Sequence, residues 1–471
     1  MENYSVVMTD EIHQQLLKHL LREDEDEDLC FATYVPGKGS KRLTGIISKI
    51  ILPQEGDRNV HGNVGFMPCY LERVLKIAAQ NKEGVAFLHA HPDTGWQGMS
   101  PDDVIAETRL APAVMGVTGL PVLGLTLGTD GAWSARFWIK DELQKRTFNR
   151  MWCENVRVIS KKLSITFNDD LLPPNFDVGK QLRTISAWGE KAQEDISRLR
   201  VGIIGLGSVG SMVAEILART GISYFTLIDF DPVEEKNLDR LTNVFSSDIG
   251  KAKVEVIKAA ILKSGTSPSI EVVSCNYSIC EKESFLEALN CDIIFCCVDR
   301  PWPRQVINFI SYAYLIPVID GGILVRTNKK NTKLVGADWR AHTVGYLRPC
   351  LECIGQYKTE NATLEKQGYL DDPSYLKDFP EAAKLNAHEN VFAFGSHLAS
   401  MEVLQMLSLF LAPGDIADLG QQMYHFVLGS LEVSRINCHE NCFFPTIIGK
   451  GDHSGIEVYG EHKVAEQARG R

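Results

Sequence analysis

Two histidines, a serine and an aspartate in the N-terminal third of the chain have the spacing of a metal-dependent hydrolase. They are His89, His91, Ser100 and Asp103, in the stretch HAHP followed by a loop and SPDD. Residues two apart on the strand predicted over 85–91 share a face, so both imidazoles are presented together. Asp103, at the start of the next predicted helix, is a third ligand and leaves one tetrahedral position for water. The predicted chemistry is zinc-assisted hydrolysis, in which a base carries the proton of that water to the leaving amine.

The same residues resemble the JAB/JAMM metalloprotease family, whose pattern is an upstream Glu, then His-x-His-Pro, a loop and Ser-x-x-Asp. The resemblance covers about residues 10–140. It implies a zinc isopeptidase in which Ser100 donates a hydrogen bond to the oxyanion and a Glu on the first strand is the general base. Glu27 fits that position best, and Glu25 and Glu55 are the alternatives.

A glycine-rich turn in the second half of the chain has the context of a phosphate site. Gly205, Gly207 and Gly210 follow a predicted strand and open a helix, which lets a phosphate approach the backbone N–H groups. Asp229, at the end of the next predicted strand, stands where a dinucleotide fold places its ribose-binding carboxylate, so these residues fit NAD as well as ATP. The polar residues beyond it favour a triphosphate with Mg²⁺, because they combine cations with carboxylates at strand ends. These residues are Asp231, Asn237, Arg240, Lys251, Lys253, Asp299 and Arg304.

Residues from about Arg183 to Pro445 resemble the ubiquitin-activating enzyme superfamily, which includes the ThiF-like sulfur-carrier adenylyltransferases. The resemblance implies ATP- and Mg²⁺-dependent adenylation of the C-terminus of a ubiquitin-like protein. By this resemblance Asp229 binds the ribose and Asp299 holds Mg²⁺, while the phosphates are contacted by Arg183, Asn237, Arg240 and Lys253.

Two close pairs of cysteines predict a second zinc ion with a structural role. Cys350 and Cys353 form one pair and Cys438 and Cys442 the other, and His439 could replace one thiol. If all four thiols bind zinc, no cysteine remains between residues 355 and 437, where the superfamily's thioester-forming enzymes keep theirs. Three alternatives stay open: the reaction stops at the acyl-adenylate, a hydroxyl in 358–367 accepts the acyl group, or Cys350 or Cys353 is not a zinc ligand.

The order of apolar segments predicts an α/β protein with two domains. An α+β domain is expected over 1–145, with strands on either side of the hairpin signal PGKGSK. A doubly wound Rossmann-like domain is expected over 181–450, because apolar runs alternate there with helical segments. The prolines of LLPPNFDVGK favour a connector over 146–180, and 451–471 is expected to be a C-terminal tail.

Composition narrows the class of protein. The chain has 471 residues, of which 44% are hydrophobic, and this is enough apolar material for two cores. A formal charge of −11 argues against nucleic acid as a partner. No signal sequence or membrane span is visible, so a cytoplasmic protein is expected. In that compartment the twelve cysteines are thiols or metal ligands.

A peptidase fused to an adenylating domain makes chemical sense around one ubiquitin-like substrate. The peptidase would mature or release the modifier, and the second domain would activate its carboxylate. The resemblance implies a prokaryotic ubiquitin-like conjugation system, a setting that includes antiviral defence, with a ubiquitin-conjugating-like enzyme as a further partner and a homodimer as the assembly. The alternatives are a thiocarboxylate pathway that processes a sulfur carrier, and a binding scaffold with inactive sites.

Overall fold

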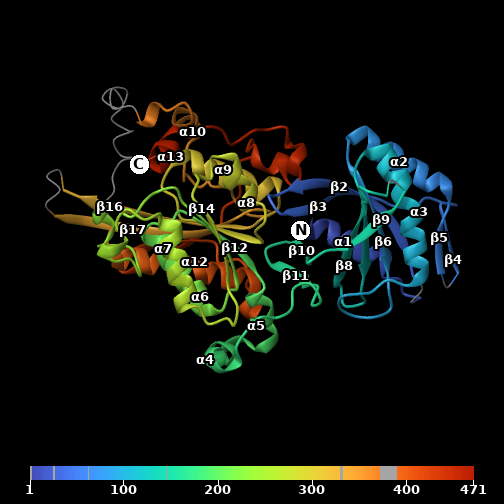
Figure 1. Ribbon diagram of the computed structural model, residues 1–471, viewed down its shortest axis with the longest axis horizontal. Helices are drawn as coiled ribbons and strands as arrows, with labels where there is room; N and C mark the ends of the chain where they lie inside the picture. The colour runs from blue at the N-terminus through green and yellow to red at the C-terminus, as the bar shows by residue number, and fades with distance from the viewer. Residues whose placement is uncertain are drawn as a thin grey trace. The chain divides into compact units, whose positions relative to one another are not determined.

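The computed structural model describes residues 3–24, 27–61, 63–144, 146–328, 333–371 and 390–470. The chain divides into two compact units, coloured from blue to teal and from green to red in Figure 1. The first unit comprises Met1–Pro173 with Ala313–Leu315 and Ile447–Gly455, and the second comprises Pro174–Tyr312, Ile316–Thr446 and Ile456–Arg471.

The first unit is built on a nine-stranded mixed sheet with the order β11-β10-β1-β3-β2-β6-β7-β8-β9. The central strand β2 is buried along nearly its whole length, because both faces of the sheet are covered. The hairpin expected at PGKGSK joins β2 to β3, which pair antiparallel. The strands are β1 (Asn3–Thr9), β2 (Leu29–Lys38), β3 (Arg42–Ile51), β6 (Gly84–Ala90), β7 (Val122–Leu127), β8 (Trp133–Lys140), β9 (Phe148–Trp152), β10 (Asn155–Ile159) and β11 (Leu163–Phe167), and β4 (Arg58–His61) pairs separately with β5 (Asn63–Phe66).

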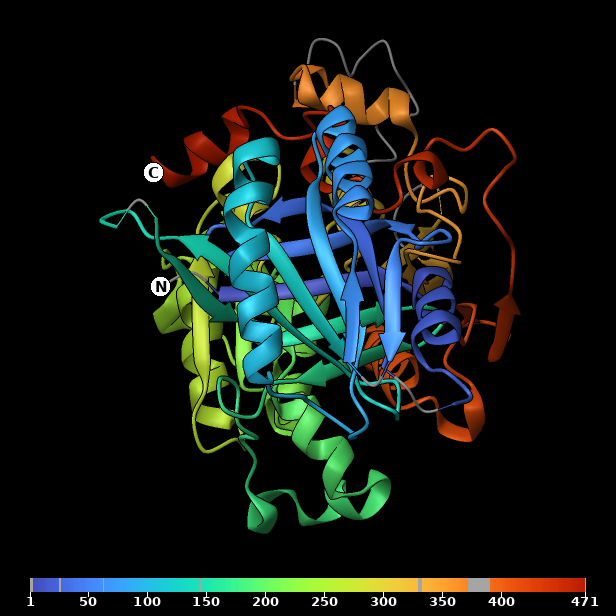
Figure 2. The same cartoon turned by 90° about the vertical axis from the view of Figure 1, so that its right-hand side faces the viewer.

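Three helices cover the two faces of this sheet. Helix α1 (Asp10–Leu20) packs Leu16 and Leu20 into the core on one face. Helices α2 (Pro68–Asn81) and α3 (Pro101–Thr118) form the core on the other face, where Leu29 and Phe87 meet them. Figure 2 shows α2 and α3 lying across the sheet on the side toward the viewer. Each face therefore has its own hydrophobic core.

The expected connector over 146–180 differs from what the structure contains. Residues 148–167 form β9, β10 and β11, which add to both edges of the first sheet, and the first unit continues to Pro173. The physical reason is that NVRVI and LSITF are rich in β-branched residues, which suit a pleated sheet. Residues 168–177, around the prolines, form the longest stretch of 146–180 outside helices and strands.

The second unit contains the predicted doubly wound sheet, extended by an antiparallel part. Its order is β14-β13-β12-β15-β16-β17-β18-β19, in which β14 to β16 run parallel and β16 to β19 antiparallel. The strands are β12 (Arg200–Ile204), β13 (Tyr224–Ile228), β14 (Glu271–Cys275), β15 (Ile293–Cys296), β16 (Val318–Thr327), β17 (Leu334–Val344), β18 (Gln421–His425) and β19 (Ser430–Ser434).

Helices lie on both faces of this second sheet, as a doubly wound fold requires. Figure 1 places α6, α7 and α12 on one side of it and α8 and α9 on the other. The helices are α4 (Val178–Trp188), α5 (Glu190–Ser197), α6 (Ser208–Thr220), α7 (Lys253–Ser264), α8 (Lys282–Ala288), α9 (Pro301–Ala313), α10 (Thr359–Lys366), α12 (Phe392–Leu411) and α13 (Lys463–Arg469).

The expected C-terminal tail over 451–471 is also more structured than the sequence indicates. Residues 451–454 form a short 3-10 helix that belongs to the first unit, and 463–469 form α13 in the second. No helix among the described residues is long and apolar enough to cross a membrane.

Candidate functional site

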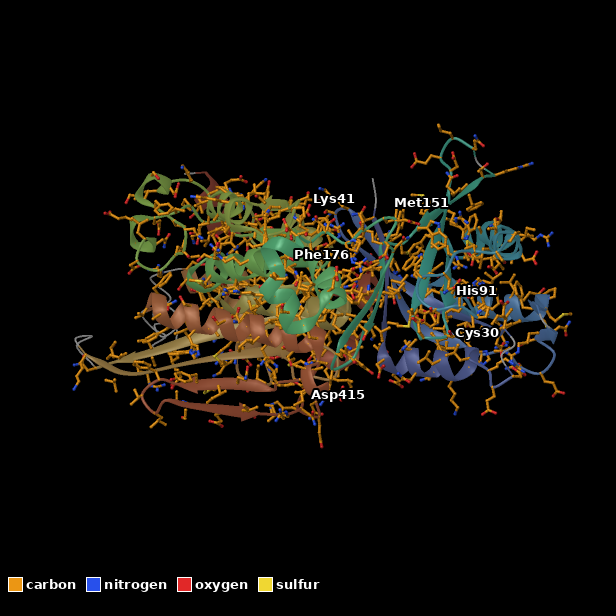
Figure 3. All side chains as sticks on the ribbon, turned by 90° about the horizontal axis from the view of Figure 1, so that it is seen from below. Cys30, Lys41, His91, Met151, Phe176 and Asp415 are labelled. Carbon is orange, nitrogen blue, oxygen red and sulfur yellow. The ribbon has the colours of Figure 1, made fainter. Side chains whose placement is uncertain are left out.

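The strand β6 and the first turn of α3 bring the three predicted metal ligands of the first unit together. The Nε2 atoms of His89 and His91 lie 3.2 Å apart, and each lies 3.2 Å from a different oxygen of the Asp103 carboxylate. Figure 3 labels His91 in this unit. Burial raises the pKa of Asp103, but its hydrogen bonds with the two histidines lower it by more, so the pKa lies well below its usual range. The three side chains therefore present two ring nitrogens and an ionised carboxylate to one point.

The donor set fits a zinc ion. Zinc bonds of about 2.0–2.1 Å in a tetrahedron separate neighbouring ligand atoms by about 3.3 Å, close to the distances within the cluster. His89 is buried and His91 and Asp103 are half-buried, so one side of the cluster stays open to a water or a substrate. Three protein ligands with an open fourth position are the arrangement of catalytic rather than structural zinc.

Ser100 fixes the helix that carries Asp103. The Ser100 hydroxyl accepts a hydrogen bond of 3.1 Å from the Asp103 N–H, and the Ser100 N–H donates one of 2.8 Å to Oδ2 of Asp103. This capping box orients the carboxylate and leaves the hydroxyl proton of Ser100 free to be donated elsewhere. The same serine can therefore both cap α3 and donate to an oxyanion.

Glu27 shares a face of the sheet with the two histidines. Leu29 pairs with His89 across the antiparallel β2 and β6 strands, and the Ala90 N–H donates to the Asp28 carbonyl, which continues the register. Glu27 is therefore the residue opposite His91, and residues directly opposite each other point to one face. Glu55 lies in the loop before β4, and Glu25 lies outside the described residues.

The sequence reasoning missed a buried ion pair beneath His89. Glu107, one helical turn after Asp103, accepts hydrogen bonds from the Arg136 guanidinium on β8 and from the Trp138 indole, the latter at 2.6 Å. Arg136 also donates to the hydroxyl of Thr126, which lies 3.4 Å from Nε2 of His89. The spacing of four between Asp103 and Glu107 was the only sequence signal of this network.

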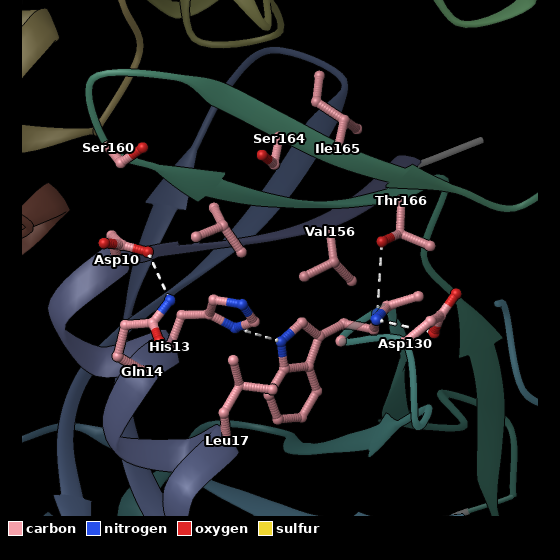
Figure 4. Close-up of a pocket in the computed structure, with 14 residues that line it drawn as sticks. Asp10, His13, Gln14, Leu17, Asp130, Val156, Ser160, Ser164, Ile165 and Thr166 are labelled. Atoms are coloured by element: carbon pink, nitrogen blue, oxygen red, sulfur yellow. Dashed lines mark hydrogen bonds between the residues drawn. The ribbon is translucent and has the colours of Figure 1, made fainter. Parts of the chain in front are cut away.

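A pocket of about 400 Å³ lies on the opposite face of the same sheet (Figure 4). It is lined by residues of α1, β8, β10 and β11, and the Trp133 indole donates a hydrogen bond of 3.0 Å to Nδ1 of His13 at its base. Burial lowers the pKa of His13 although Asp10 opposes this. The pocket is separated from the His89 cluster by the sheet, so it takes no part in that cluster's chemistry.

In the second unit, the glycine turn between β12 and α6 has a backbone that only glycine allows. Gly205 adopts φ +88°, and a Cβ on Gly210 would lie 1.9 Å from the Gly205 carbonyl oxygen. Gly207 is the N-cap residue of α6, and it leaves the first N–H groups of the helix without a side-chain cap. An anion at this helix N-terminus would satisfy those groups.

Asp229 and Lys253 form a buried pair beside this turn. Asp229 accepts hydrogen bonds from the N–H groups of Leu206 at 2.7 Å and Asp231 at 2.8 Å, which tie the end of β13 to the glycine turn. Lys253 lies 2.7 Å from Asp231 and 3.9 Å from Asp229. Burial lowers the pKa of Lys253, but the two carboxylates raise it by more, so the amine stays charged, while burial raises the pKa of Asp229.

The remaining residues predicted to bind the nucleotide make fewer contacts with one another. Asn237 is buried and its side-chain oxygen accepts the Glu234 N–H, so its amide NH₂ is left to donate. Arg240 is held by the Lys236 carbonyl at 2.6 Å. Asp299 follows β15 and is exposed. Burial lowers the pKa of Arg304, but nearby negative charges raise it by more, chiefly Asp320 and to a smaller extent Asp299.

Arg183, like Arg240 and Asp299, has no hydrogen bond or ion pair with Asp229 or Lys253 among the described residues. It is an exposed residue in the middle of α4, and no hydrogen bond or ion pair with the other nucleotide residues is present among the described residues.

The four cysteines meet at one point in the second unit. Their sulfur atoms lie within 4.8 Å of one another, and the His439 N–H donates to Sγ of Cys353 at 3.4 Å. The hydrogen bond with Cys350 lowers the pKa of Cys438 to about 5, as a thiolate ligand requires. Four thiols without the His439 ring fit a structural zinc site.

One further thiol lies close to the nucleotide residues. Cys297 follows β15 two residues before Asp299, and its carbonyl oxygen lies under Gly205. Burial, together with Glu402, raises the pKa of the Cys297 thiol well above its usual value. Cys297 is half-buried, and a thiol whose pKa is raised is a poorer nucleophile than a thiolate, so these features do not favour Cys297 as an acyl acceptor.

The second unit is thus a Rossmann-like α/β domain with a glycine turn, a strand-end carboxylate and a charged lysine at the carboxyl edge of its sheet. The chain belongs to the ThiF family, whose model matches residues 178–442.

Several characterised proteins are similar to this chain. The molybdopterin-synthase adenylyltransferase of Escherichia coli (strain K12) is 28% identical over 170 residues, which cover 36% of this chain and 64% of that protein. Ubiquitin-like modifier-activating enzyme 5 of Culex quinquefasciatus is 34% identical over 131 residues, covering 25% of this chain and 32% of that protein. The matched region thus spans less than two thirds of each of these relatives.

Among solved structures, E. coli MccB with ATP superposes with a TM-score of 0.42 and 20% identity, covering 57% of this chain and 74% of that one.

Proposed function

We propose that the second unit adenylates the C-terminal carboxylate of a ubiquitin-like or sulfur-carrier protein. The observation that carries this proposal is the convergence of the glycine turn, Asp229 and the charged Lys253 at the carboxyl edge of the sheet. Membership of the ThiF family supports it, as do the activities named for the similar molybdopterin-synthase adenylyltransferase and ubiquitin-like modifier-activating enzyme 5.

In this reaction a C-terminal carboxylate oxygen of the ubiquitin-like or sulfur-carrier substrate attacks the α-phosphorus of ATP. A new P–O bond forms, the bond to the leaving pyrophosphate breaks, and pyrophosphate departs. Asp229 would bind the ribose, and the N–H groups at the start of α6 would receive the phosphates. Lys253 and Arg240 would offset the charge that grows on the α-phosphate and the leaving pyrophosphate, with Asn237 as a further donor. Asp299 would hold Mg²⁺ together with phosphate oxygens.

We propose that the first unit is a zinc-dependent peptidase of the JAB/JAMM type that acts on the same modifier. A zinc ion held by His89, His91 and Asp103 would lower the pKa of a bound water and polarise the scissile carbonyl. Glu27 would take the proton of the water and return it to the amine that leaves. The Ser100 hydroxyl would donate to the oxyanion.

A sulfur-transfer role is the second candidate, and one specific observation favours it. Relatives include the adenylyltransferase and sulfurtransferase MOCS3 of Drosophila willistoni, 27% identical over 40% of this chain. With a sulfide donor, the adenylated protein would become a thiocarboxylate; with a conjugating enzyme, it would be joined to a lysine. Analysis of the products formed with each co-reactant distinguishes a thiocarboxylate from a lysine conjugate.

ATP:pyrophosphate exchange tests the adenylation proposal. Wild-type protein is assayed with each small ubiquitin-like candidate encoded nearby, beside Arg240→Ala and Asp299→Ala. Exchange that needs one candidate and is lost in both variants is the expected result. Folded wild-type protein that exchanges with no candidate would favour a binding scaffold.

Cleavage of the same candidate extended by a short C-terminal peptide tests the peptidase proposal. Loss of cleavage in His91→Ala and Glu27→Gln, with cleavage kept in Glu55→Gln, is expected. Equal cleavage by wild type and His91→Ala would remove the metal from the mechanism.

A further inference from the structure

The C-terminal segment, defined as residues 456–470, packs within the second unit against loops that follow its parallel strands. The Gly460 N–H donates a hydrogen bond of 2.7 Å to the Cys280 carbonyl, in the loop after β14. The Trp302 indole, at the start of α9 after β15, donates one of 2.9 Å to the Val458 carbonyl. The segment is thus attached to the loops that follow two parallel strands, β14 and β15, which lie on either side of β13 and β12 in the sheet.

His462 extends this contact to the third strand end. Its ring lies 5.4 Å from that of Phe230, which follows β13, and 5.3 Å from that of Trp302, both in edge-to-face geometry. Only 7% of His462 is exposed. Phe230 stands between Asp229 and Asp231, so His462 packs on the residue that links the two carboxylates of the nucleotide site.

A bidentate ion pair holds the end of the segment. The Arg469 guanidinium donates two hydrogen bonds of 2.7 and 2.6 Å to the Glu281 carboxylate and lies over the Tyr277 ring. Glu281 is itself 94% buried and accepts the Ser278 N–H at 2.7 Å, so the ion pair also fixes the loop 276–281. Planar, bidentate pairs of this kind are strong and geometrically specific.

The contacts of the C-terminal segment lie at the edge of the second sheet where a ligand is expected to bind. In open α/β sheets, ligands bind outside the carboxyl ends of the parallel strands. All three attachment points of the segment follow such ends, at β13, β14 and β15. The side chains that would bind the ribose and Mg²⁺, Asp229 and Asp299, follow two of the same strands.

We propose that the C-terminal segment braces the nucleoside half of the nucleotide site, with His462 and Arg469 as positioning residues. His462 holds the Asp229–Asp231 turn through Phe230, and Arg469 holds the loop 276–281 through Glu281. Neither residue touches the reacting atoms, so the brace sets the affinity for ATP and not the rate of adenylyl transfer. This inference rests on the proposed adenylation function.

The test compares ATP binding and exchange in the full chain. Arg469→Ala and His462→Ala are each measured by calorimetric titration with ATP and by exchange at saturating ATP, beside wild type and Arg435→Ala, which removes an exposed arginine of the same unit. We expect the Kd for ATP to rise at least about fivefold in the two brace variants, within the usual range of coupling between sites. In both brace variants, exchange at saturating ATP should stay within about twofold of wild type. The Arg435→Ala control should keep both its Kd for ATP and its exchange within about twofold of wild type.

Two further measurements separate a positioning role from a merely structural one. Exchanging the charges, with Arg469→Glu and Glu281→Arg together, should restore part of the ATP affinity. Because coupling is reciprocal, ATP should slow hydrogen exchange at residues 456–470 of the wild type.

The possible failures are distinguishable. A wild type that binds no ATP overturns the proposed function itself. If the wild type binds ATP and both brace variants bind it with the same Kd, the brace is overturned. The brace is also overturned if the variants lose exchange at saturating ATP as much as they lose affinity for ATP. If Arg469→Ala does not fold, His462→Ala and the charge exchange decide the question.

Discussion

Lys253 is the single residue on which the proposed adenylation depends most. Its amine is buried beside Asp229 and Asp231 and stays charged because of them. Lys253→Ala leaves the growing charge on the phosphates without a preorganised cation, so we expect exchange to fall by about 10²–10³. Lys263→Ala, which removes an exposed lysine from the same helix, is the matched control and should exchange as wild type does.

Glu107 contributes to the stability of the first unit through a buried ion pair. It is fully buried with the Arg136 guanidinium, and removing one partner of such a pair leaves an uncompensated charge. Glu107→Ala should lower the free energy of unfolding of the first unit by about 3–5 kcal/mol. Urea unfolding followed by tryptophan fluorescence measures this, with the exposed Glu142→Ala as control. If Glu107→Ala lowers the free energy of unfolding by no more than Glu142→Ala does, the ion pair contributes little to stability.

At the scale of elements, one histidine joins three strands of the second sheet. His425 on β18 contacts Asp338 on β17 at 2.9 Å and Glu432 on β19 at 3.4 Å. These hydrogen bonds raise the pKa of His425 above its ordinary value of 6.5. Because the folded pKa is the higher one, the stabilisation is fully present below pH 6.5 and is lost as pH rises through the raised value.

Hydrogen exchange at β18 and β19 checks this pH dependence. Protection, corrected for the intrinsic effect of pH, should decrease from pH 6 to pH 8 in the wild type, around the ordinary histidine pKa of about 6.5. His425→Gln should remove most of that change. An unchanged pH dependence in His425→Gln would show that another group is responsible.

The elements also show which parts of the fold could be predicted from the sequence. The βαβ units of the second unit were predicted correctly, because a fully buried parallel strand is a continuous apolar run. The short strands β9 to β11 were missed, because β9 and β11 are partly exposed edge strands with little apolar signal and the buried β10 contains the polar residues Asn155 and Arg157. Site residues close in sequence, such as His89, His91 and Asp103, were found together, whereas Arg136 and Glu107 meet only after the sheet and α3 have packed.

At the scale of the whole molecule, the two clusters of possible metal ligands belong to different units, so we expect each to bind its ion independently of the other. Elemental analysis of the purified wild type is expected to find two zinc ions per chain, one for each cluster. His91→Ala and Cys353→Ser should each lose one ion, and only Cys353→Ser should lower the melting temperature of the second unit, because structural zinc contributes to folding. One ion in the wild type that only Cys353→Ser removes would contradict the proposed peptidase.

Under the proposed function, one modifier would be processed by the first unit and activated by the second. Activation needs a free C-terminal carboxylate, and the peptidase would produce that group by removing an extension or a target. Adenylation would then need the product of the peptidase but none of its side chains, and cleavage would not depend on adenylation. His91→Ala should therefore adenylate a processed modifier at the wild-type rate, and Lys253→Ala should still process an extended one.

The most direct test of adenylation is mass spectrometry of the candidate modifier after incubation with ATP, Mg²⁺ and the protein. The account predicts a modifier whose mass has increased by one AMP, formed by wild type and His91→Ala and absent with Lys253→Ala. A modifier that remains unchanged with folded wild type, or that gains AMP equally with Lys253→Ala, would contradict it.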